Sequence, residues 1–317
     1  MLEVFFCNVG DGDAVLLREH GEAGADYTVL VDAGRPYVEP REGSLRKDAL
    51  EYLAARGVTH LDRMILTHPH IDHVGGALRI VRALRVDRLE MLTVPPEDAS
   101  FVLRSFTSTK KPPNGLRQML NILRELCEGA RERGTEVGVI PPGEQALTHG
   151  LTMTVYYPRQ EVVDRQRQVF EALYRGEPVD DELCTQAAKE RNVSSLMLRF
   201  TYAGRSVLLT GDRYAADWEG EDIPPCDILK LPHHGDKKSM TEALLRKLSP
   251  WCAVVSCEND PNARKERPGE EIAALLVKHL PLVLCTENRP MAVMEGSTSN
   301  GIRFDVGPDG AVSCCRE

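Results

Sequence analysis

Long apolar runs are absent from this sequence. No stretch of its 317 residues approaches the roughly 20 consecutive apolar residues that a membrane-spanning helix requires. The opening segment, Met1 to Phe6, contains a glutamate and no basic residue, unlike a secretory signal peptide. These absences predict a cytoplasmic protein with no membrane partner.

Paired cysteine motifs and an excess of basic charge are also missing. The nine cysteines are scattered and form no CxxC pair, so reduced thiols are expected rather than a disulfide framework. With 39 basic and 48 acidic residues the net charge is −9, which argues against binding of nucleic acid by bulk electrostatics. A nuclease is still compatible with this charge, because bound divalent cations reverse the field locally.

What is present is a pattern of strands in two blocks. Short strands between Leu2 and Asp32, separated by turn residues, predict a β-meander, and a second block of strands begins at Ser194. Helices are expected at Ser44–Arg56, with Ser44 as the cap, and at Leu116–Arg133, and a late strand is expected near 291–294. Two blocks with strands first and helices after predict an α/β protein of two packed sheets with helices outside.

The segment 159–190 is polar and charged and is predicted to be helical. We interpret it as an insertion in a single domain that spans residues 1–317. Because it looks grafted onto the domain, it is also a candidate docking segment for a protein partner.

A dense cluster of metal-binding residue types follows a short buried strand that ends at Thr67. It contains His68, His70, Asp72 and His73 within six residues. Imidazole and carboxylate groups are ligands for Zn²⁺ and similar cations, so His68 and His70 are expected to bind one ion and Asp72 and His73 a second. The alternative, a chance histidine-rich surface loop, is disfavoured by this compact spacing.

Two further strand ends carry the same kinds of residue. An apolar strand ends at Asp212, which alone would be an ordinary turn aspartate but beside the cluster is interpreted as a carboxylate that bridges two metals. Another buried strand ends at His233 and His234. We expect His234 to complete the second metal site, and His233 to contact the substrate or protonate the leaving group. Asp32 either orients the histidine loop or is a plain turn residue.

Taken in this order, these elements resemble the metallo-β-lactamase superfamily, and more narrowly the hydrolase domain of ComEC-type DNA-internalisation competence proteins. The narrower resemblance rests on five segments: Asn8–Asp13, Leu66–His68, Asn192–Leu196, Leu208–Asp212 and Leu229–Gly235. It implies an αββα sandwich of two mixed sheets flanked by helices, with two divalent metal ions, zinc favoured over manganese, at the edge between the sheets. It also implies hydrolysis, often of phosphodiesters, with nuclease activity in the competence branch.

The sequence departs from the family pattern at several positions. Asn8 stands where the competence family usually has Asp, Asp236 where Ser is usual, and Arg267-Pro268 where a His-Pro is frequent. The superfamily's isolated histidine between the first cluster and Asp212 has no clear counterpart, because His149 lies in a turn pattern. Glu97, Asp98 or water remain open as the missing ligand.

The leading hypothesis is metal-assisted hydrolysis of a phosphodiester, in nucleic acid or in a small molecule, by a hydroxide held between two ions. Asp72 would also steer that hydroxide. Several basic residues are candidates for binding phosphate, although each can equally be part of a solvated helix face: Arg79, Arg82, Arg85, Arg88, Lys110, Lys111 and Arg117. The alternatives are a hydrolase of a small ester, lactone or β-lactam-like substrate, and a non-catalytic, metal-stabilised protein that binds a partner.

Overall fold

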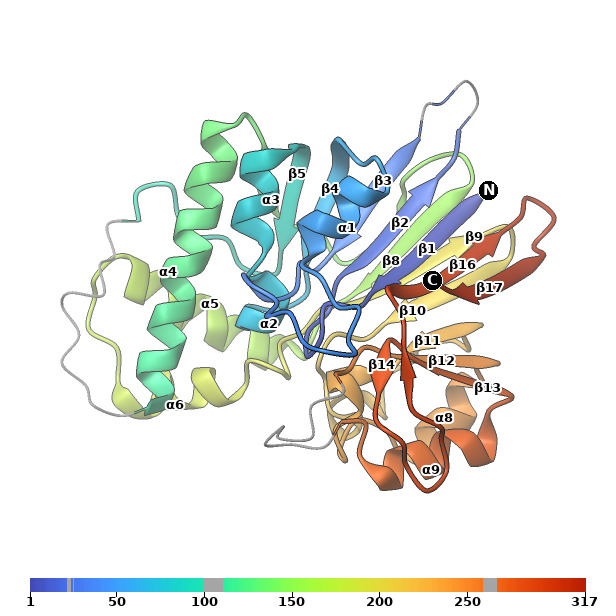
Figure 1. The fold of residues 1–317 in the computed structure, drawn as a ribbon. Coiled ribbons are helices and arrows are strands. Elements are labelled where there is room, and N and C mark those ends of the chain that lie inside the picture. Colours follow the sequence, from blue (N-terminus) through green and yellow to red (C-terminus); the bar gives the residue numbers. More distant parts are fainter. Residues whose placement is uncertain (22–23, 25, 100–110, 259–266) are drawn as a thin grey trace.

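Two large β-sheets pack face to face, with helices on both outer sides (Figure 1). The computed structural model describes the chain except for residues 22–23, 25, 100–110 and 259–266. This is the four-layer α/β arrangement that the sequence predicts. Within the described residues, no helix is both long and apolar enough to cross a membrane.

The first sheet combines both ends of the chain. Its eight strands are β1 (Leu2–Cys7), β2 (Val15–Glu19), β3 (Tyr27–Val31), β4 (His60–Leu66), β5 (Arg85–Met91), β6 (Glu136–Val139), β16 (Gly301–Val306) and β17 (Val312–Arg316). They lie in the order β17-β16-β1-β2-β3-β4-β5-β6. The predicted meander is confirmed, because β1, β2 and β3 pair antiparallel, whereas β3 to β6 run parallel.

The second sheet is built from the middle of the chain. Its seven strands are β7 (Gly143–Ala146), β8 (Leu151–Tyr156), β9 (Met197–Tyr202), β10 (Arg205–Leu209), β11 (Ile228–Lys230), β12 (Cys252–Val255) and β13 (Leu282–Cys285). They lie in the order β13-β12-β11-β10-β9-β8-β7. The strands β10 to β13 are parallel, so their carboxyl ends meet at one edge of the sheet.

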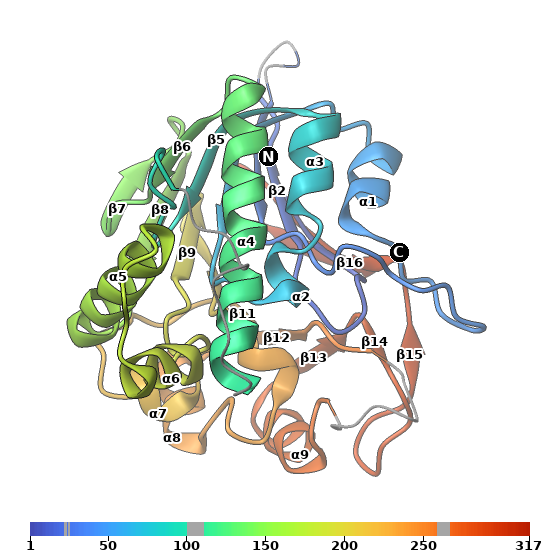
Figure 2. The ribbon, with the colours of Figure 1, turned by 90° about the vertical axis from the view of Figure 1, so that its left-hand side faces the viewer.

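The helices cover the outer faces of both sheets (Figure 2). On the side of the first sheet lie α1 (Ala49–Ala55), α2 (Ile71–Val74), α3 (Ala77–Ala83), α4 (Lys111–Glu132), α5 (Gln160–Tyr174) and α6 (Asp181–Lys189). On the side of the second sheet lie α7 (Ala215–Trp218), α8 (Glu242–Leu248) and α9 (Glu270–His279).

Alternation along the strands divides the core into layers. In β1 the side chains of Leu2, Val4 and Phe6 are buried between the two sheets, whereas Phe5 and Cys7 are buried under the helices. Successive side chains of a strand point to opposite faces, so a strand that is apolar throughout contributes to two cores at once.

The helices of segment 160–189 join the outer layer of the first sheet, although the segment connects two strands of the second sheet. Phe170 and Cys184 are buried in the same apolar cluster as the inner face of α4, and the Tyr174 hydroxyl donates to the carbonyl of Leu120. The apolar faces of α5 and α6 are therefore used within the domain.

Two local predictions are wrong. Helix α1 begins at Ala49 rather than Ser44, because Asp48 forms a capping box with Glu51 and the Ser44 hydroxyl instead donates to Glu287. No strand covers 291–294, where a single bridge joins Met291 to Met294. The short strands nearby are β14 (Glu287–Asn288) and β15 (Ser297–Thr298).

Candidate metal centre

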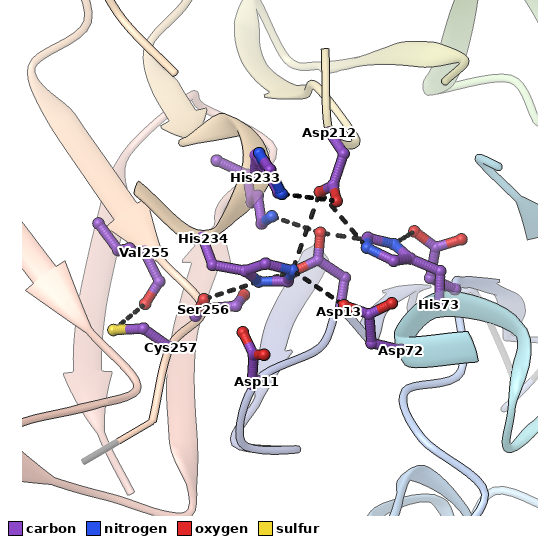
Figure 3. Close-up of polar contacts among 12 residues, drawn as sticks. Asp11, Asp13, Asp72, His73, Asp212, His233, His234, Val255, Ser256 and Cys257 are labelled. Atoms are coloured by element: carbon purple, nitrogen blue, oxygen red, sulfur yellow. Dashed lines mark hydrogen bonds and ion pairs between the residues drawn. The ribbon is translucent and has the colours of Figure 1, made fainter. Parts of the chain in front are cut away.

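The predicted site residues converge at the edge where the two sheets meet (Figure 3). The loop that carries His68 and His70 follows β4 of the first sheet, and α2 continues it with Asp72 and His73. Asp212 and His233-His234 follow β10 and β11 of the second sheet. Each strand is apolar and buried, so the polar residues are placed where the strands end.

One group of ligand atoms is formed by His68, His70 and Asp212. His68 Nε2 lies 3.0 Å from His70 Nδ1 and 3.6 Å from Asp212 Oδ2. Burial first, then the positive charge of Arg191, lowers the pKa of His70 to about 4. The His70 ring is therefore neutral at neutral pH, which is the form that binds a metal. Its Nδ1 and the Nε2 of His68 face the same point.

A second group contains Asp72, His73 and His234, and Asp212 contacts this group as well. Asp212 Oδ1 lies 3.3 Å from His73 Nε2 and 3.9 Å from His234 Nε2, and Asp72 Oδ2 lies 3.6 Å from His234 Nε2. Asp212 thus presents one oxygen to each group. The four side chains of this group, Asp212 included, are fully or mostly buried.

The buried atoms at the centre of this group have no hydrogen-bond partner. They are His73 Nε2, His234 Nε2 and Asp212 Oδ1. The other ring nitrogens are occupied, since His73 Nδ1 lies 2.8 Å from Asp32 Oδ2 and His234 Nδ1 lies 3.0 Å from the carbonyl of Ser256. Unpaired buried groups are costly, and a cation among these lone pairs would satisfy all of them, so the residues fit a metal.

The electrostatics of His73 point the same way. Burial alone would lower its pKa, but Asp212 and Asp32 together raise the pKa of His73 well above its usual value. A position that attracts a proton this strongly is rich in negative charge. A divalent cation would take the place of that proton when it binds.

Asp32 lies under the histidine loop and ties it to β3. It accepts hydrogen bonds from the backbone N–H of Thr67 at 2.8 Å, from the Thr67 hydroxyl at 2.8 Å, and from His73 Nδ1. Its backbone is left-handed, with φ of 58°, which is uncommon for a residue other than glycine. These contacts support the prediction that Asp32 orients the loop rather than serving as a plain turn residue.

The two adjacent histidines after β11 point in different directions because their backbone is left-handed. The φ values are 48° at His233 and 56° at His234, and Gly235 continues with 78°. Non-glycine residues in this region carry strain and are concentrated at functional sites. The turn sends His234 to Asp72 and to Asp212 Oδ1, whereas His233 Nε2 lies 3.8 Å from Asp212 Oδ2 and also contacts a neighbouring polar group.

His233 is held by three side chains outside the metal groups. Its Nε2 accepts hydrogen bonds from Arg267 Nη2 at 2.9 Å and from Asn192 Nδ2 at 3.4 Å, and the Tyr214 ring packs edge-on at 5.1 Å. Burial, together with the charge of Arg267, lowers the pKa of His233 to about 4. His233 is therefore a neutral ring whose Nε2 acts as an acceptor.

A buried ion pair that the sequence reading missed lies behind His234. Lys230 is 1% exposed and its Nζ contacts Asp13 Oδ2, while Asp13 Oδ1 lies 3.6 Å from His234 Nδ1. The available signal was a lysine in an otherwise apolar strand, which is rare unless the charge is paired. The position of its partner, far away in sequence, had no local signal.

No third histidine joins the first group among the described residues. His149 is exposed in the turn between β7 and β8, and Glu97 and Asp98 are exposed as well. The groups of residues within reach of a common ion include none of these three. Within the described part of the chain, His68, His70 and Asp212 are thus the side chains that face this position.

Three of the seven basic residues predicted to bind phosphate pair with acidic side chains. Arg79 pairs with Asp48, and Arg85 and Arg88 pair with acidic side chains on the surface. Arg82 is exposed and Arg117 is buried. Lys110 and the side chain of Lys111 lie outside the described residues.

The comparison with family models decides the classification. The model of the metallo-beta-lactamase superfamily matches residues 7–257. The chain belongs to the metallo-beta-lactamase superfamily. The sequence-based resemblance and the αββα fold are both confirmed, and the chain is a metal-dependent hydrolase of this superfamily by its family and its His/Asp clusters.

Two curated relatives match most of this chain over part of their own length. It is 28% identical to ComE operon protein 3 of Bacillus subtilis (strain 168) over 301 residues, which are 90% of this chain and 32% of that protein. It is 24% identical to Recombination protein 2 of Haemophilus influenzae over 252 residues, 78% of this chain and 23% of that protein. The chain therefore spans a third or less of either relative.

Several solved structures are similar in fold. The metallo-beta-lactamase fold protein YhfI from Bacillus subtilis gives a TM-score of 0.48 at 12% identity, covering 90% of this chain and 96% of that one. The isothiocyanate hydrolase from Delia radicum gut bacteria gives 0.46 at 15% identity, with coverage of 90% and 96%.

One departure from the family pattern has a physical reason. Asn8 Nδ2 donates to Glu287 Oε2 at 3.1 Å and to the carbonyl of Ser299 at 2.8 Å. A carboxylate at this position would face another carboxylate, so the amide suits the glutamate that this chain carries at 287.

Proposed function

We propose that this protein is a phosphodiesterase that works with two divalent cations on nucleic acid or a small phosphodiester. The observation that carries the proposal is the position of Asp212, whose two oxygens face two separate groups of imidazole and carboxylate side chains. Two neighbouring cations that share a carboxylate suit displacement at phosphorus, because charge develops on both the attacking and the leaving oxygen.

His68, His70 and Asp212 would hold the first cation, and Asp72, His73 and His234 the second, with Asp212 near His73 and His234 as well. Four of these six residues supply imidazole nitrogen, which favours zinc over manganese. When bound, the two cations would supply Lewis acidity and make hydroxide available at neutral pH.

The protein groups around these sites have distinct tasks. Burial alone would raise the pKa of Asp72, but His234, whose Nε2 lies 3.6 Å from Asp72 Oδ2, and the charge of His73 hold this pKa well below its usual range. The Asp72 carboxylate is therefore ionised and can orient a water molecule. His233 Nε2 accepts hydrogen bonds, so we favour substrate contact for His233 over protonation of the leaving group.

A hollow beside His233 favours a small phosphodiester over long nucleic acid. Its volume is about 620 Å³ and its lining is Tyr214, Asp236, Lys237, Lys238, Gly269, Glu270 and Glu271. Two basic and three acidic side chains give this wall no net attraction for a polyanion. The overall charge of −9 has the same effect.

The test is hydrolysis of bis(p-nitrophenyl) phosphate, single-stranded DNA and RNA by protein loaded with zinc or manganese. We expect His70→Ala and Asp212→Ala to abolish turnover, and His149→Ala, a matched exposed histidine, to leave it unchanged. Turnover that survives both site variants would reject the assignment. The salt dependence of substrate binding separates the two substrate classes, because long nucleic acid loses affinity steeply with salt.

A further inference from the structure

We propose that Arg191 binds the anionic group of the substrate beside the first metal position, a role that deepens the proposed function and rests on it. The ligand class is a phosphate group, held by a planar guanidinium that can donate two parallel hydrogen bonds to its oxygens. Arg191 was not among the basic residues that the sequence analysis selected.

Contacts with two helices, α6 and α4, hold the Arg191 side chain in place. It lies just after α6, and its Nε donates to the carbonyl of Ala188 at 2.7 Å. Its Nη1 lies against α4, 4.0 Å from Met119 Sδ and 3.7 Å from the place where a Cβ on Gly115 would be. These contacts hold the side chain through a carbonyl, a thioether and backbone, and none of them neutralises its charge.

The segment that begins at Arg191 borders the metal centre. The next residue, Asn192, donates to His233 and to the Tyr214 hydroxyl, and the backbone N–H of Leu196 donates to the carbonyl of Thr67, next to His68. Through Asn192 and Leu196, the segment that begins at Arg191 therefore contacts both His233 and the loop that carries His68 and His70. The positive charge of Arg191 also helps to lower the pKa of His70.

Arg191 differs from two other arginines near the site because it has no counterion among the described residues. Arg267 Nη1 lies 2.6 Å from Asp11, and Arg213 Nη1 lies 3.0 Å from Glu221. Among the residues that the structure describes, no carboxylate lies within 4.0 Å of Arg191. A half-buried cation without a partner is costly, and burial lowers the pKa of Arg191 accordingly.

Binding of metal would increase the need for an anion at this place. Two divalent cations would outweigh the carboxylates of Asp32, Asp72 and Asp212 by one positive charge, and Arg191 adds another. A phosphate group that enters between the cations and Arg191 would meet attractive charge on both sides. A neutral ester or lactone would leave Arg191 unpaired.

The experiment measures binding of inorganic phosphate to the zinc-loaded protein by isothermal titration calorimetry. We expect Arg191→Gln to weaken binding by roughly tenfold to a hundredfold, since charge-assisted hydrogen bonds are lost. The phosphate affinity of Arg191→Lys should lie between those of Arg191→Gln and the unmodified protein. The control Arg246→Gln, which changes an exposed arginine on α8, should bind phosphate as the unmodified protein does. Phosphate binding that Arg191→Gln leaves unchanged, or that the unmodified protein lacks, would overturn the proposal.

Two further measurements keep the outcomes separate. Metal content and thermal unfolding of each variant show whether the fold and the centre are intact, and Arg191→Met, which keeps the apolar contact with Met119, replaces Arg191→Gln if the latter does not fold. If phosphate binds through Arg191 but no phosphodiester is hydrolysed, the proposed function fails while the anion site stands. If phosphodiesters are hydrolysed with an unchanged KM in Arg191→Gln, the anion site fails alone.

Discussion

His73 Nδ1 lies 2.8 Å from Asp32 Oδ2, and this contact fixes which nitrogen of the ring faces the metal centre. The carboxylate accepts the proton on Nδ1, so Nε2, which faces Asp212, is the nitrogen left to bind a metal ion. We expect Asp32→Ala to lower the affinity of the second site for zinc by roughly 10–100-fold, the usual effect of removing such a partner. Competition with a chromophoric chelator measures this, and Asp26→Ala, an exposed aspartate, is the control.

The shared position of Asp212 predicts an unequal response to loss of a carboxylate. Asp212→Ala should release both ions, because this side chain faces both groups, whereas Asp72→Ala should release the second ion and keep the first. Metal analysis of dialysed protein by mass spectrometry gives the stoichiometry. Equal loss in the two variants would contradict a bridging role for Asp212.

The buried pair of Lys230 and Asp13 predicts a large effect on stability. Lys230→Met leaves the Asp13 carboxylate buried beside His234 without its cation, which should cost about 3–5 kcal/mol in the free energy of unfolding. Adding Asp13→Asn should recover part of this loss, because the uncompensated charge is removed. Urea denaturation of both single variants and the double variant measures the coupling, and a coupling near zero would reject the pair as an interaction.

The amide of Asn8 predicts a pH-dependent penalty for its acidic counterpart. In Asn8→Asp the new carboxyl faces Glu287, so its pKa in the folded state is raised above the unfolded value of about 3.9. The folded state then holds more protons above that pH, and stability must fall as pH rises. We expect a loss of about 1–3 kcal/mol at pH 7 that shrinks towards pH 4. Parallel urea titrations with Asn8→Ala as the control test the sign.

Much of the site was predictable from the sequence because its residues follow the ends of apolar strands. Asp212 and His234 each follow an apolar strand, and parallel strands present their carboxyl ends at one edge, so their meeting with the His68 to His73 loop follows from local pattern and topology. The layered arrangement of sheets and helices was also predictable from local sequence pattern. The start of α1 did not, because Ser44 and Asp48 are both good caps and only the tertiary contact of Ser44 with Glu287 decides between them.

Other parts of the centre had no signal in the sequence. Asp13 and Lys230 are brought together by the packing of the two sheets, and neither has a neighbour in sequence that marks it as a partner. Arg191 sits in a charged stretch at the end of α6, where the residue type is ordinary. What distinguishes it is the absence of a counterion within the described structure, and that is a property of the folded surroundings alone.

The pairing of β16 with β1 constrains the order in which the two sheets can fold. Leu2 pairs with Val306 and Cys7 with Gly301, and the carbonyl of Asn300 accepts from the N–H of Asn8. Strand β1 therefore lacks one of its two neighbours until residues 301–306 have been synthesised, after all strands of the second sheet. Its edge is exposed until then, so the first sheet is expected to finish folding later than the second.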